Sequence, residues 1–461
     1  MFDDSTTASL AAGLRALAAR LSAGDRLPSN RELVEQHRVS PVTVSRAIAL
    51  LAAEGVVVTR PGSGTYVAAA AGPSRAQPDT AWQTVALTDR SVDTTPITDA
   101  FGLPPADAIL LDGGYLHHSL QPVRALNAAL VRAARRPDAW DRAPATGLAT
   151  LRSTFANLIG GVSAEDVLVT AGGQSALSLA FRAIAAPGSP ILVESPSYPG
   201  ALAAARAAGL RPTPVPVDEH GLRLDLLADA FAMHGARLLY CQPTHHNPTG
   251  AVLSPQRRQQ VIDVARAAGA FVIEDDFARF LGHGGPIPRT LLADDRDGTV
   301  VYLTSLTKPA APSMRIGALI ARGPVMDRMR AVRRVDDFFV AQPMQEAALE
   351  LLTSPAWERH VRSLAVALRQ RCGTLVAAIT RQRPDWTVTQ VPSGGLHVWV
   401  RLPPGSDDVE VARAARRLGV AVGAGSRYFA TEPPAAHLRL GFAATADHAE
   451  LVEAARRLAE L

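Results

Sequence analysis

The sequence predicts an α/β protein with two folding units. A small helical unit with a two-stranded hairpin is followed by a large unit whose mostly parallel sheet is covered by helices. The chain has 461 residues, enough for two or three domains of about 100 to 200 residues each. Helix and hairpin signals fill residues 1–70, and from about residue 150 short β-branched runs alternate with Ala/Leu/Arg-rich stretches, a pattern typical of parallel sheets. Residues 71–106 are rich in turn formers, so we expect a linker there and the large unit at 107–461.

The composition excludes several classes of protein. Apolar residues make up 47% of the chain and charged residues 20%, which is globular composition. No run approaches 18 apolar residues, and the first four residues lack the basic flank and apolar stretch of a signal peptide. Two widely separated cysteines, Cys241 and Cys372, cannot build a disulfide framework or a zinc site alone. We therefore expect a cytoplasmic protein without a membrane span.

Three helices are predicted near the N-terminus. Leucines at one-face spacing mark a helix over 9–21. Ser29 begins a second, short helix, and Glu32 completes its capping box. Ser40 caps a third helix, with Pro41 at its first position.

A predicted hairpin follows these helices. Strands at 56–59 and 65–67 flank a Pro-Gly-Ser-Gly turn at 61–64. Three helices followed by a two-stranded wing are the layout of a winged helix-turn-helix, whose third helix enters the major groove of DNA.

The stretch from Leu27 to Val67 resembles the GntR family, through Leu-Pro-Ser, an Arg-Glu pair, the recognition helix and an Arg-Pro-Gly-x-Gly-Thr wing. The resemblance implies a set of residues near the DNA: Ser29, Arg31, Thr43, Arg46 and Gly62. Family members often carry arginine at the positions of Pro41 and Ser45, so the base preference does not carry over. A small protein-interaction module is the alternative interpretation.

The chain contains 47 lysines and arginines, of which only Lys308 is a lysine. Arginine stays protonated, and only lysine offers a neutral amine that can form a Schiff base. A residue that arginine could not replace is therefore a candidate catalytic or cofactor-binding group. Chance survival on the surface is the alternative.

Polar residues follow the five predicted strands of the large unit, at 167–170, 191–193, 238–240, 271–273 and 300–303. Ligands bind at the carboxyl ends of parallel strands, so these residues are expected to share one site. They provide a small-residue turn into a helix, an aromatic ring, an amide, a carboxylate and the lone lysine. Such groups suit pyridoxal 5'-phosphate (PLP).

From about residue 107 to 461 the chain resembles the fold-type I, class I aminotransferases, through Asn247-Pro248-Thr249-Gly250, the strand end at Asp275, and Ser305-x-x-Lys308 with Arg315. The resemblance implies a PLP Schiff base on Lys308 and a carboxylate, Asp275, at the pyridine nitrogen. It implies Asn247 at the phenolic oxygen and Tyr198 stacked on the ring. The implied phosphate ligands are Gly173, Gln174, Ser305 and Arg315, and Arg439 would pair with a carboxylate of the substrate or effector.

Two departures from this family pattern are visible. Relatives usually carry a tyrosine where Phe277 stands, and its hydroxyl would donate to the phenolic oxygen. Losing that donor predicts a higher pKa for the cofactor imine. In 140–144 relatives carry a tyrosine that reaches the phosphate of the partner subunit, so that contact is open here.

Three other features of the chain invite different interpretations. Ser305-x-x-Lys308 also matches penicillin-binding enzymes, but their Lys-Thr-Gly motif cannot exist with one lysine. Adjacent histidines, 117–118 and 245–246, should diverge on an extended chain, so we expect no metal site. A basic patch, formed by Arg328, Arg330, Arg333 and Arg334, is predicted to be a solvated helix face, with docking to DNA or to the small unit as the alternative.

A GntR-type winged helix joined to an aminotransferase-like unit resembles the MocR family of transcriptional regulators. The resemblance implies a PLP-dependent regulator that binds a double-stranded DNA operator as a head-to-tail homodimer and senses PLP, an amine or an amino acid. Two alternatives stay open. The chain is an active aminotransferase with an appended DNA-binding module, or its large unit is a dimerisation scaffold that no longer binds the cofactor.

Overall fold

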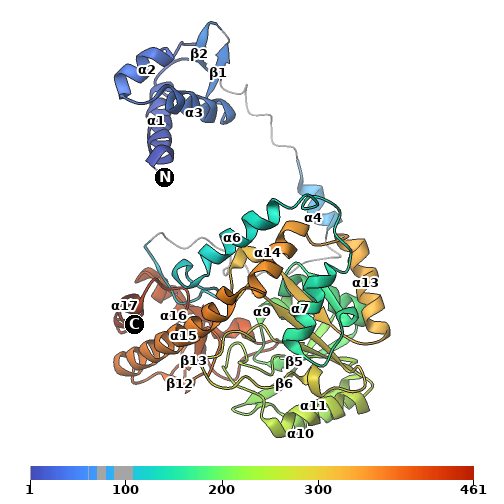
Figure 1. Cartoon of the computed structure of the whole chain (residues 1–461). Helices are drawn as coiled ribbons and strands as arrows, with labels where there is room; N and C mark the ends of the chain where they lie inside the picture. Colours follow the sequence, from blue (N-terminus) through green and yellow to red (C-terminus); the bar gives the residue numbers. More distant parts are fainter. Residues whose placement is uncertain (1, 61, 70–78, 88–106) are drawn as a thin grey trace. The chain divides into compact units, whose positions relative to one another are not determined.

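The computed structural model describes residues 2–60, 62–69, 79–87 and 107–461. The chain divides into two compact units, residues 1–91 and 92–461. The predicted linker over 71–106 lies largely outside the described residues. Its described part contains a short helix, α4 (Ala81–Ala86), that begins after Thr80. Figure 1 labels the elements of both units.

Up to Val67, the described residues of the small unit form three helices and a hairpin, as the sequence predicts. The helices are α1 (Phe2–Ala18), α2 (Asn30–His37) and α3 (Pro41–Ala53). Strands β1 (Val57–Arg60) and β2 (Gly64–Val67) pair in antiparallel register. The Ser29 capping box is present, and Ser40 accepts a hydrogen bond from the backbone of the third helix. One apolar cluster, which includes Leu14, Leu33 and Leu51, holds the three helices together.

The large unit is built on an eight-stranded sheet with the order β4-β11-β10-β9-β8-β5-β6-β7. Its strands are β4 (Val167–Thr170), β5 (Pro190–Ser195), β6 (Arg211–Asp218), β7 (Gly221–Leu222), β8 (Leu238–Cys241), β9 (Phe271–Asp275), β10 (Val300–Ser305) and β11 (Gly317–Ile320). The five central strands run parallel, and β11 runs antiparallel between β4 and β10. The mostly parallel sheet is therefore confirmed.

Both faces of this sheet are covered by helices. Along β4, Val167 and Val169 join one apolar core, whereas Leu168 joins the other, because alternate side chains point to opposite faces. The first core includes residues of α6 (Val123–Ala134), α7 (Ala149–Ile159), α10 (Leu224–His234), α11 (Pro255–Ala267), α12 (Leu291–Asp294) and α14 (Gln342–Leu352). The second includes residues of α8 (Gly173–Ile184), α9 (Pro199–Ala207) and α13 (Pro324–Asp336).

A four-stranded sheet of order β12-β13-β16-β15 forms a second layer. It contains β12 (Thr387–Gln390), β13 (His397–Arg401), β15 (Gly423–Ala424) and β16 (His437–Gly441). Helices α15 (Pro355–Gln382), α16 (Asp408–Arg417) and α17 (His448–Leu458) accompany it. Strand β3 (Ile109–Leu110) pairs with β14 (Val420–Ala421), which ties the start of the large unit to its C-terminal part. Short 3-10 turns lie at His118–Leu120, Ala164–Asp166, Pro312–Met314 and Gly425–Tyr428.

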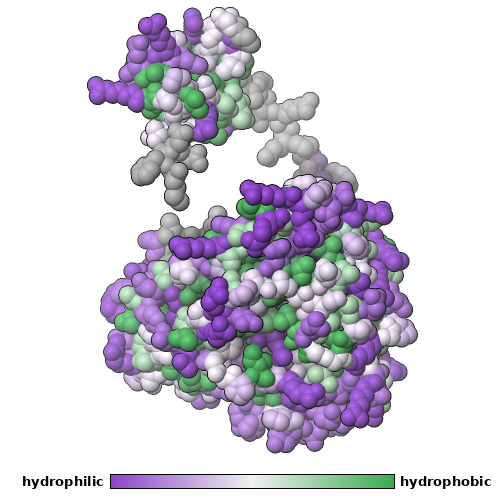
Figure 2. Space-filling view, in the orientation of Figure 1, coloured by the Kyte–Doolittle hydropathy of each residue, from purple (hydrophilic) through white to green (hydrophobic). Residues whose placement is uncertain are grey.

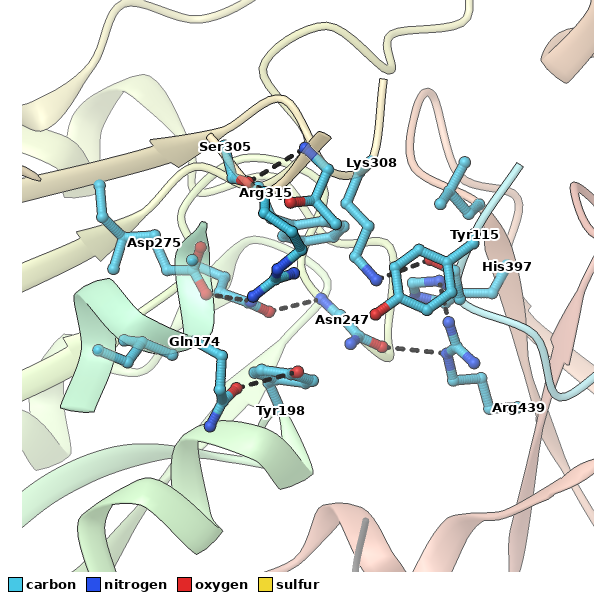
Figure 3. Close-up of a pocket in the computed structure, with 18 residues that line it drawn as sticks. Tyr115, Gln174, Tyr198, Asn247, Asp275, Ser305, Lys308, Arg315, His397 and Arg439 are labelled. Carbon is cyan, nitrogen blue, oxygen red and sulfur yellow. Dashed lines mark hydrogen bonds between the residues drawn. The ribbon is translucent and has the colours of Figure 1, made fainter. Parts of the chain in front are cut away.

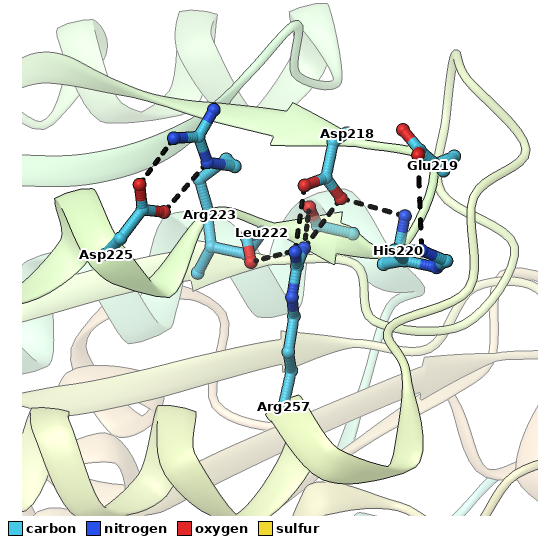
Figure 4. Close-up of polar contacts among 8 residues, drawn as sticks. Asp218, Glu219, His220, Leu222, Arg223, Asp225 and Arg257 are labelled. Carbon is cyan, nitrogen blue, oxygen red and sulfur yellow. Dashed lines mark hydrogen bonds and ion pairs between the residues drawn. The ribbon is translucent and has the colours of Figure 1, made fainter.

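A partly buried ion pair anchors the β6–β7 hairpin (Figure 4). Arg257 of α11 donates to both carboxylate oxygens of Asp218, at 2.6 and 2.9 Å, and to the carbonyls of Gly221 and Leu222. Arg223 and Asp225 form a separate pair nearby. Because these charged groups pair with one another across the hairpin, α10 and α11, we interpret this cluster as structural.

The visible face of the large unit is mainly hydrophilic, with scattered apolar side chains (Figure 2). Within the described ranges, no helix is long and apolar enough to cross a membrane. Arg333 is buried, 1% exposed, and pairs with Asp337 at 3.0 Å, so its assignment to a solvated basic face was wrong. The rings of His117 and His118 do not diverge but lie 3.9 Å apart between centroids.

Candidate functional site

A pocket opens at the carboxyl ends of the parallel strands in the large unit (Figure 3). All nine residues that the sequence assigned to a cofactor and carboxylate site line it: Gly173, Gln174, Tyr198, Asn247, Asp275, Ser305, Lys308, Arg315 and Arg439. Most of these residues meet because parallel strands deliver their ends to one edge of the sheet, whereas Arg439 comes from β16 of the four-stranded sheet. The role of each residue stays a prediction.

Lys308 lies in this pocket on the turn after β10. Its Nζ donates to the carbonyl oxygen of Gly114 at 2.7 Å and lies 3.8 Å from the ring centroid of Tyr115. Burial, then the nearby charge of Arg439, lowers the pKa of Lys308 to about 7, although Asp275 acts in the opposite direction. A large fraction of the amine is therefore neutral and nucleophilic near neutral pH.

Asp275, at the end of β9, has one carboxylate oxygen that accepts hydrogen bonds and one that accepts none of normal geometry from the described residues. Its Oδ2 accepts from the hydroxyl of Tyr240 at 2.6 Å and from Nε2 of Gln242 at 2.9 Å. Its Oδ1 is buried and has no hydrogen bond of normal geometry to any described residue. Burial raises the pKa of this carboxyl. Because an unsatisfied buried acceptor is costly, the site suits a ligand that donates an N–H here.

The N-terminus of α8 forms a cradle with the residues after β10. Arg315 donates to the carbonyl of Ala171 at 2.9 Å, and the hydroxyls of Ser305 and Thr307 are 2.8 Å apart. Gly172 precedes α8 with φ +87°, and a Cβ there would meet the Arg315 guanidinium at 3.1 Å and the Thr307 hydroxyl at 3.2 Å. A helix N-terminus beside a guanidinium and two hydroxyls suits a phosphate.

Tyr198 and Gln174 form one wall of the pocket. The Tyr198 hydroxyl donates to Oε1 of Gln174 at 3.3 Å, and Nε2 of Gln174 donates to the carbonyl of Gly200 at 2.8 Å. The ring lies so close to Gly200 that a Cβ there would be 2.4 Å from it. Burial raises the pKa of Tyr198, so the phenol stays neutral.

Arg439, on β16, makes three hydrogen bonds. Its Nε donates to Oδ1 of Asn247 at 3.1 Å, its Nη1 to the carbonyl of Asp112 at 3.1 Å, and its Nη2 contacts Nδ1 of His397 at 3.3 Å. Because guanidinium can only donate, Nδ1 of His397 must accept. Burial and the Arg439 charge hold the pKa of His397 well below its usual range, so this imidazole is neutral.

Sequence reasoning missed several residues of the pocket: Gly114, Tyr115, Leu177, Gln242, Leu303, Thr307, Leu396 and His397. Gln242 and Thr307 stand close to residues that were predicted, so the same strand-end argument reaches them. Tyr115 follows β3 in a segment without periodicity, and His397 begins a strand of the other sheet. Phe277 lines the pocket, and its effect on a bound cofactor stays a prediction.

The predicted DNA contacts lie on the small unit in different surroundings. Arg31 has an 89% exposed side chain, with a long 3.4 Å contact to Glu35, and Arg46 and Gly62 are exposed. Ser29 caps α2. Thr43 is 3% exposed, and its hydroxyl lies 2.8 Å from that of Ser40, so it supports the start of α3. Contact of these residues with DNA stays a prediction.

The fold and the pocket define a transferase unit of the PLP-dependent, fold-type I class that follows a winged helix. Residues 110–458 match the model of aminotransferase class I and II, and residues 10–67 match that of the gntR family of bacterial regulatory proteins. The chain belongs to the aminotransferase class I and II family, and it carries a GntR helix-turn-helix domain at its N-terminus.

Known proteins of two kinds resemble the chain. The uncharacterized HTH-type transcriptional regulator YisV of Bacillus subtilis is 29% identical over 82% of this chain and 79% of its own length. The 2-aminoadipate transaminase of Thermus thermophilus is 33% identical over 68% of this chain and 79% of its own length. The crystal structure of LysN, an alpha-aminoadipate aminotransferase of Thermus thermophilus complexed with N-(5'-phosphopyridoxyl)-L-leucine, has a TM-score of 0.75 and 29% identity, and the match covers 80% of this chain and 94% of that one. The match to the aminotransferase class I and II family and the likeness to the LysN complex both support the expected cofactor, PLP.

Proposed function

We propose that this protein is a PLP-dependent, DNA-binding transcriptional regulator whose large unit senses PLP or an amine or amino-acid effector. One observation carries the proposal: the only lysine of a chain with a GntR-type winged helix lies in a pocket equipped for PLP. A DNA-binding role also supports a cytoplasmic location.

The residues of the pocket fit this cofactor. Lys308 offers a primary amine that is largely neutral near pH 7. Asp275 offers an unpaired buried oxygen for the pyridinium N–H, and Arg315 with the α8 N-terminus forms a cradle for the phosphate. When bound, PLP supplies an aldehyde that bonds reversibly to amines and a ring that withdraws electrons from them. Tyr198 would hold the ring in place, and Asn247 would donate to its phenolic oxygen.

Arg439 supports the view that the effector carries a carboxylate. Its guanidinium lines the pocket opposite the cradle residues and is held by neutral acceptors, an amide, a carbonyl and an imidazole. No acidic side chain is hydrogen-bonded to it among the described residues. A carboxylate that entered the pocket would therefore pair with a cation that lacks a hydrogen-bonded anionic partner.

A short segment connects the pocket to the linker. We call residues 111–117 the strap. Its backbone is bound to the pocket through the carbonyl of Asp112 on Arg439 and the carbonyl of Gly114 on Lys308. A ligand that bonds to Arg439 or to Lys308 would compete with the strap carbonyl that now accepts from that residue. We infer that ligand capture shifts the strap, and with it the chain that leads back to the winged helix.

A head-to-tail homodimer is part of the proposal. Large apolar side chains are strongly exposed on the large unit, among them Trp140 at 81%, Val335 at 84% and Phe338 at 68%. Nε2 of Gln342 donates to the carbonyl of Asp138 at 3.0 Å, which joins the segments that carry Trp140 and Phe338. Exposed apolar residues of this size support contact with a second copy. Two winged helices would then read two half-sites of a double-stranded operator.

The experiment has two parts. Visible absorption of the purified protein with added PLP should show a lysine-adduct band that Lys308→Ala lacks. The affinity for a DNA duplex, selected by the protein from a random library, should then change when PLP and candidate amines or amino acids are added. If both proteins lack the band, the cofactor assignment is wrong. If the band is present but DNA affinity never changes, the sensing role is wrong.

A working aminotransferase is the second candidate, supported by the pocket, which all nine predicted residues line, and by the likeness to the 2-aminoadipate transaminase. Sustained turnover with an amino donor and a keto-acid acceptor, abolished in Lys308→Ala, would favour it. If the large unit were only a dimerisation scaffold that no longer binds the cofactor, the protein with added PLP would show no cofactor band.

A further inference from the structure

Gln242, which directly follows β8, joins two residues that are expected to contact the cofactor ring at different atoms. Its Nε2 donates to Oδ2 of Asp275 at 2.9 Å, and its Oε1 accepts from the backbone N–H of Asn247 at 3.0 Å. The side chain is buried, with 2% of the residue exposed. One amide therefore connects the carboxylate expected at the pyridine nitrogen with the residue expected at the phenolic oxygen.

The chemistry of these two partners selects an amide. An ionised carboxylate can only accept hydrogen bonds, and a backbone N–H can only donate. The side chain between them must therefore donate at one end and accept at the other. The planar amide of Gln242 does both in a fixed relation, whereas a methionine of similar length has no donor and only a weak acceptor. A residue that merely filled this space would not need the amide.

Gln242 is itself held at the end of β8. Its backbone N–H donates to Oε2 of Glu194 at 2.7 Å, and Glu194 is 3% exposed. A hydrogen bond to a buried carboxylate is stronger than one between neutral groups, so the backbone of Gln242 is a firm support for its side chain.

The two residues joined by Gln242 keep one polar end each for a ligand. Oδ2 of Asp275 accepts from Tyr240 and Gln242, which leaves Oδ1 for the pyridinium N–H. Oδ1 of Asn247 accepts from Nε of Arg439 at 3.1 Å, which leaves Nδ2 to donate to the phenolic oxygen.

We propose that Gln242 is a positioning residue that couples the two ring contacts, because one amide holds both the carboxylate of Asp275 and the backbone of Asn247. The inference rests on the proposed function and deepens it. Gln242 also acts on charge. Burial raises the pKa of Asp275, and the hydrogen bonds from Tyr240 and Gln242 oppose that effect. Without the Gln242 donor, Asp275 becomes easier to protonate and stabilises a pyridinium less well.

The test is a pH titration of the lysine-adduct band in the PLP-loaded full-length chain. Gln242→Met should move the midpoint upward. A ring nitrogen without its proton withdraws fewer electrons from the imine, and a phenolic oxygen without its donor keeps more negative charge, so both changes make the imine more basic. The dissociation constant of PLP should rise about tenfold, the effect of losing a hydrogen bond to a charged group.

A matched control lies on α11. Nε2 of Gln259 donates to Oδ1 of Asp263 at 3.0 Å, and this pair is exposed and does not line the pocket. Gln259→Met therefore breaks the same kind of bond by the same substitution. It should leave the midpoint and the affinity for PLP unchanged.

A double-mutant comparison separates coupling from a simple loss of one donor. Tyr240→Phe removes the other donor to Oδ2 of Asp275, and the Tyr240 hydroxyl makes no hydrogen bond to Asn247. The midpoint shifts of Tyr240→Phe and Asn247→Ala should therefore add. Those of Gln242→Met and Asn247→Ala should overlap and fall short of their sum, because both remove the same contact at the phenolic oxygen.

Two results would overturn the coupling. One is a wild-type midpoint and PLP affinity in Gln242→Met, and the other is a set of shifts that add fully with those of Asn247→Ala. Gln242→Asn, whose shorter side chain cannot span both partners, repeats the test if Gln242→Met does not fold. A wild-type protein without the band would instead contradict the cofactor assignment, so failure of the coupling is distinguishable from failure of the proposed function.

Discussion

Capture of PLP should follow the titration of the single lysine. With a pKa of about 7 for Lys308, about half of the amine is neutral at pH 7 and about a tenth at pH 6. At an ordinary lysine pKa near 10.4, the neutral fraction at pH 7 would be below about one in a thousand. Because only the neutral amine attacks the aldehyde, the rate of capture should rise with pH and level off above about pH 8.

Two neighbours should move this midpoint in opposite directions. The positive charge of Arg439 lowers the pKa of Lys308, so Arg439→Gln should shift the midpoint upward. The negative charge of Asp275 raises that pKa, so Asp275→Asn should shift the midpoint downward. Asp275→Asn keeps the size of the side chain, whereas Arg439→Gln shortens it; each removes one charge, and the two charges have opposite signs.

The assay is stopped-flow absorbance after mixing cofactor-free protein with PLP across pH 5.5–9.5, with Lys308→Ala as the blank. The titration of the PLP phosphate is common to all three proteins, so differences between their midpoints report the lysine. A wild-type midpoint near the ordinary lysine value would refute the reasoning. So would variants that both move the midpoint in the same direction.

Three further predictions concern the cradle, a buried histidine and the small unit. Gly172→Ala should weaken PLP binding at least tenfold in equilibrium titrations because its Cβ meets the cradle arginine at 3.1 Å; Gly188→Ala, with similar φ but nothing within 4 Å, should bind normally. Burial lowers the pKa of His245 in the folded state to about 4. Between about pH 6.5 and pH 4 this histidine is therefore protonated in the unfolded chain but neutral in the folded one. The folded state should lose about 3 kcal/mol by pH 4. Denaturant melts should show that His245→Asn, which tolerates the left-handed φ of +52°, removes this part of the pH dependence. Arg31→Ala and Arg46→Ala should each reduce the salt dependence of DNA binding by about one counterion, and an unchanged slope would place that residue away from phosphate.

The site was predictable where chemistry and strand ends coincide. Asp275, Asn247 and Lys308 each lie at or after the carboxyl end of a buried strand, and the geometry of a parallel sheet brings such positions together without further information. The uniqueness of Lys308 added an independent argument from composition. These residues are far apart in the chain, yet their relation follows from one rule about parallel sheets.

The remaining features depend on contacts that local patterns do not contain. Tyr115 reaches the pocket because β3 pairs with β14, more than 300 residues later, and a two-residue strand has no detectable period. Strand β11 was missed because four apolar residues directly after the Arg315 turn did not distinguish a strand from a loop. The first helix starts at Phe2, before the leucine pattern, where Ser and Thr side chains gave no helical signal.

The solitary lysine also gives the molecule an unusual chemical simplicity. Lys308 carries the only side-chain primary amine of the chain. Borohydride reduction of a PLP adduct would therefore leave one stable secondary amine per polypeptide, and the intact mass of the chain would count occupied sites directly. Any acylating or glycating agent that modifies a lysine of this protein must do so inside the pocket. Lysine modification and cofactor capture are thus mutually exclusive on each polypeptide.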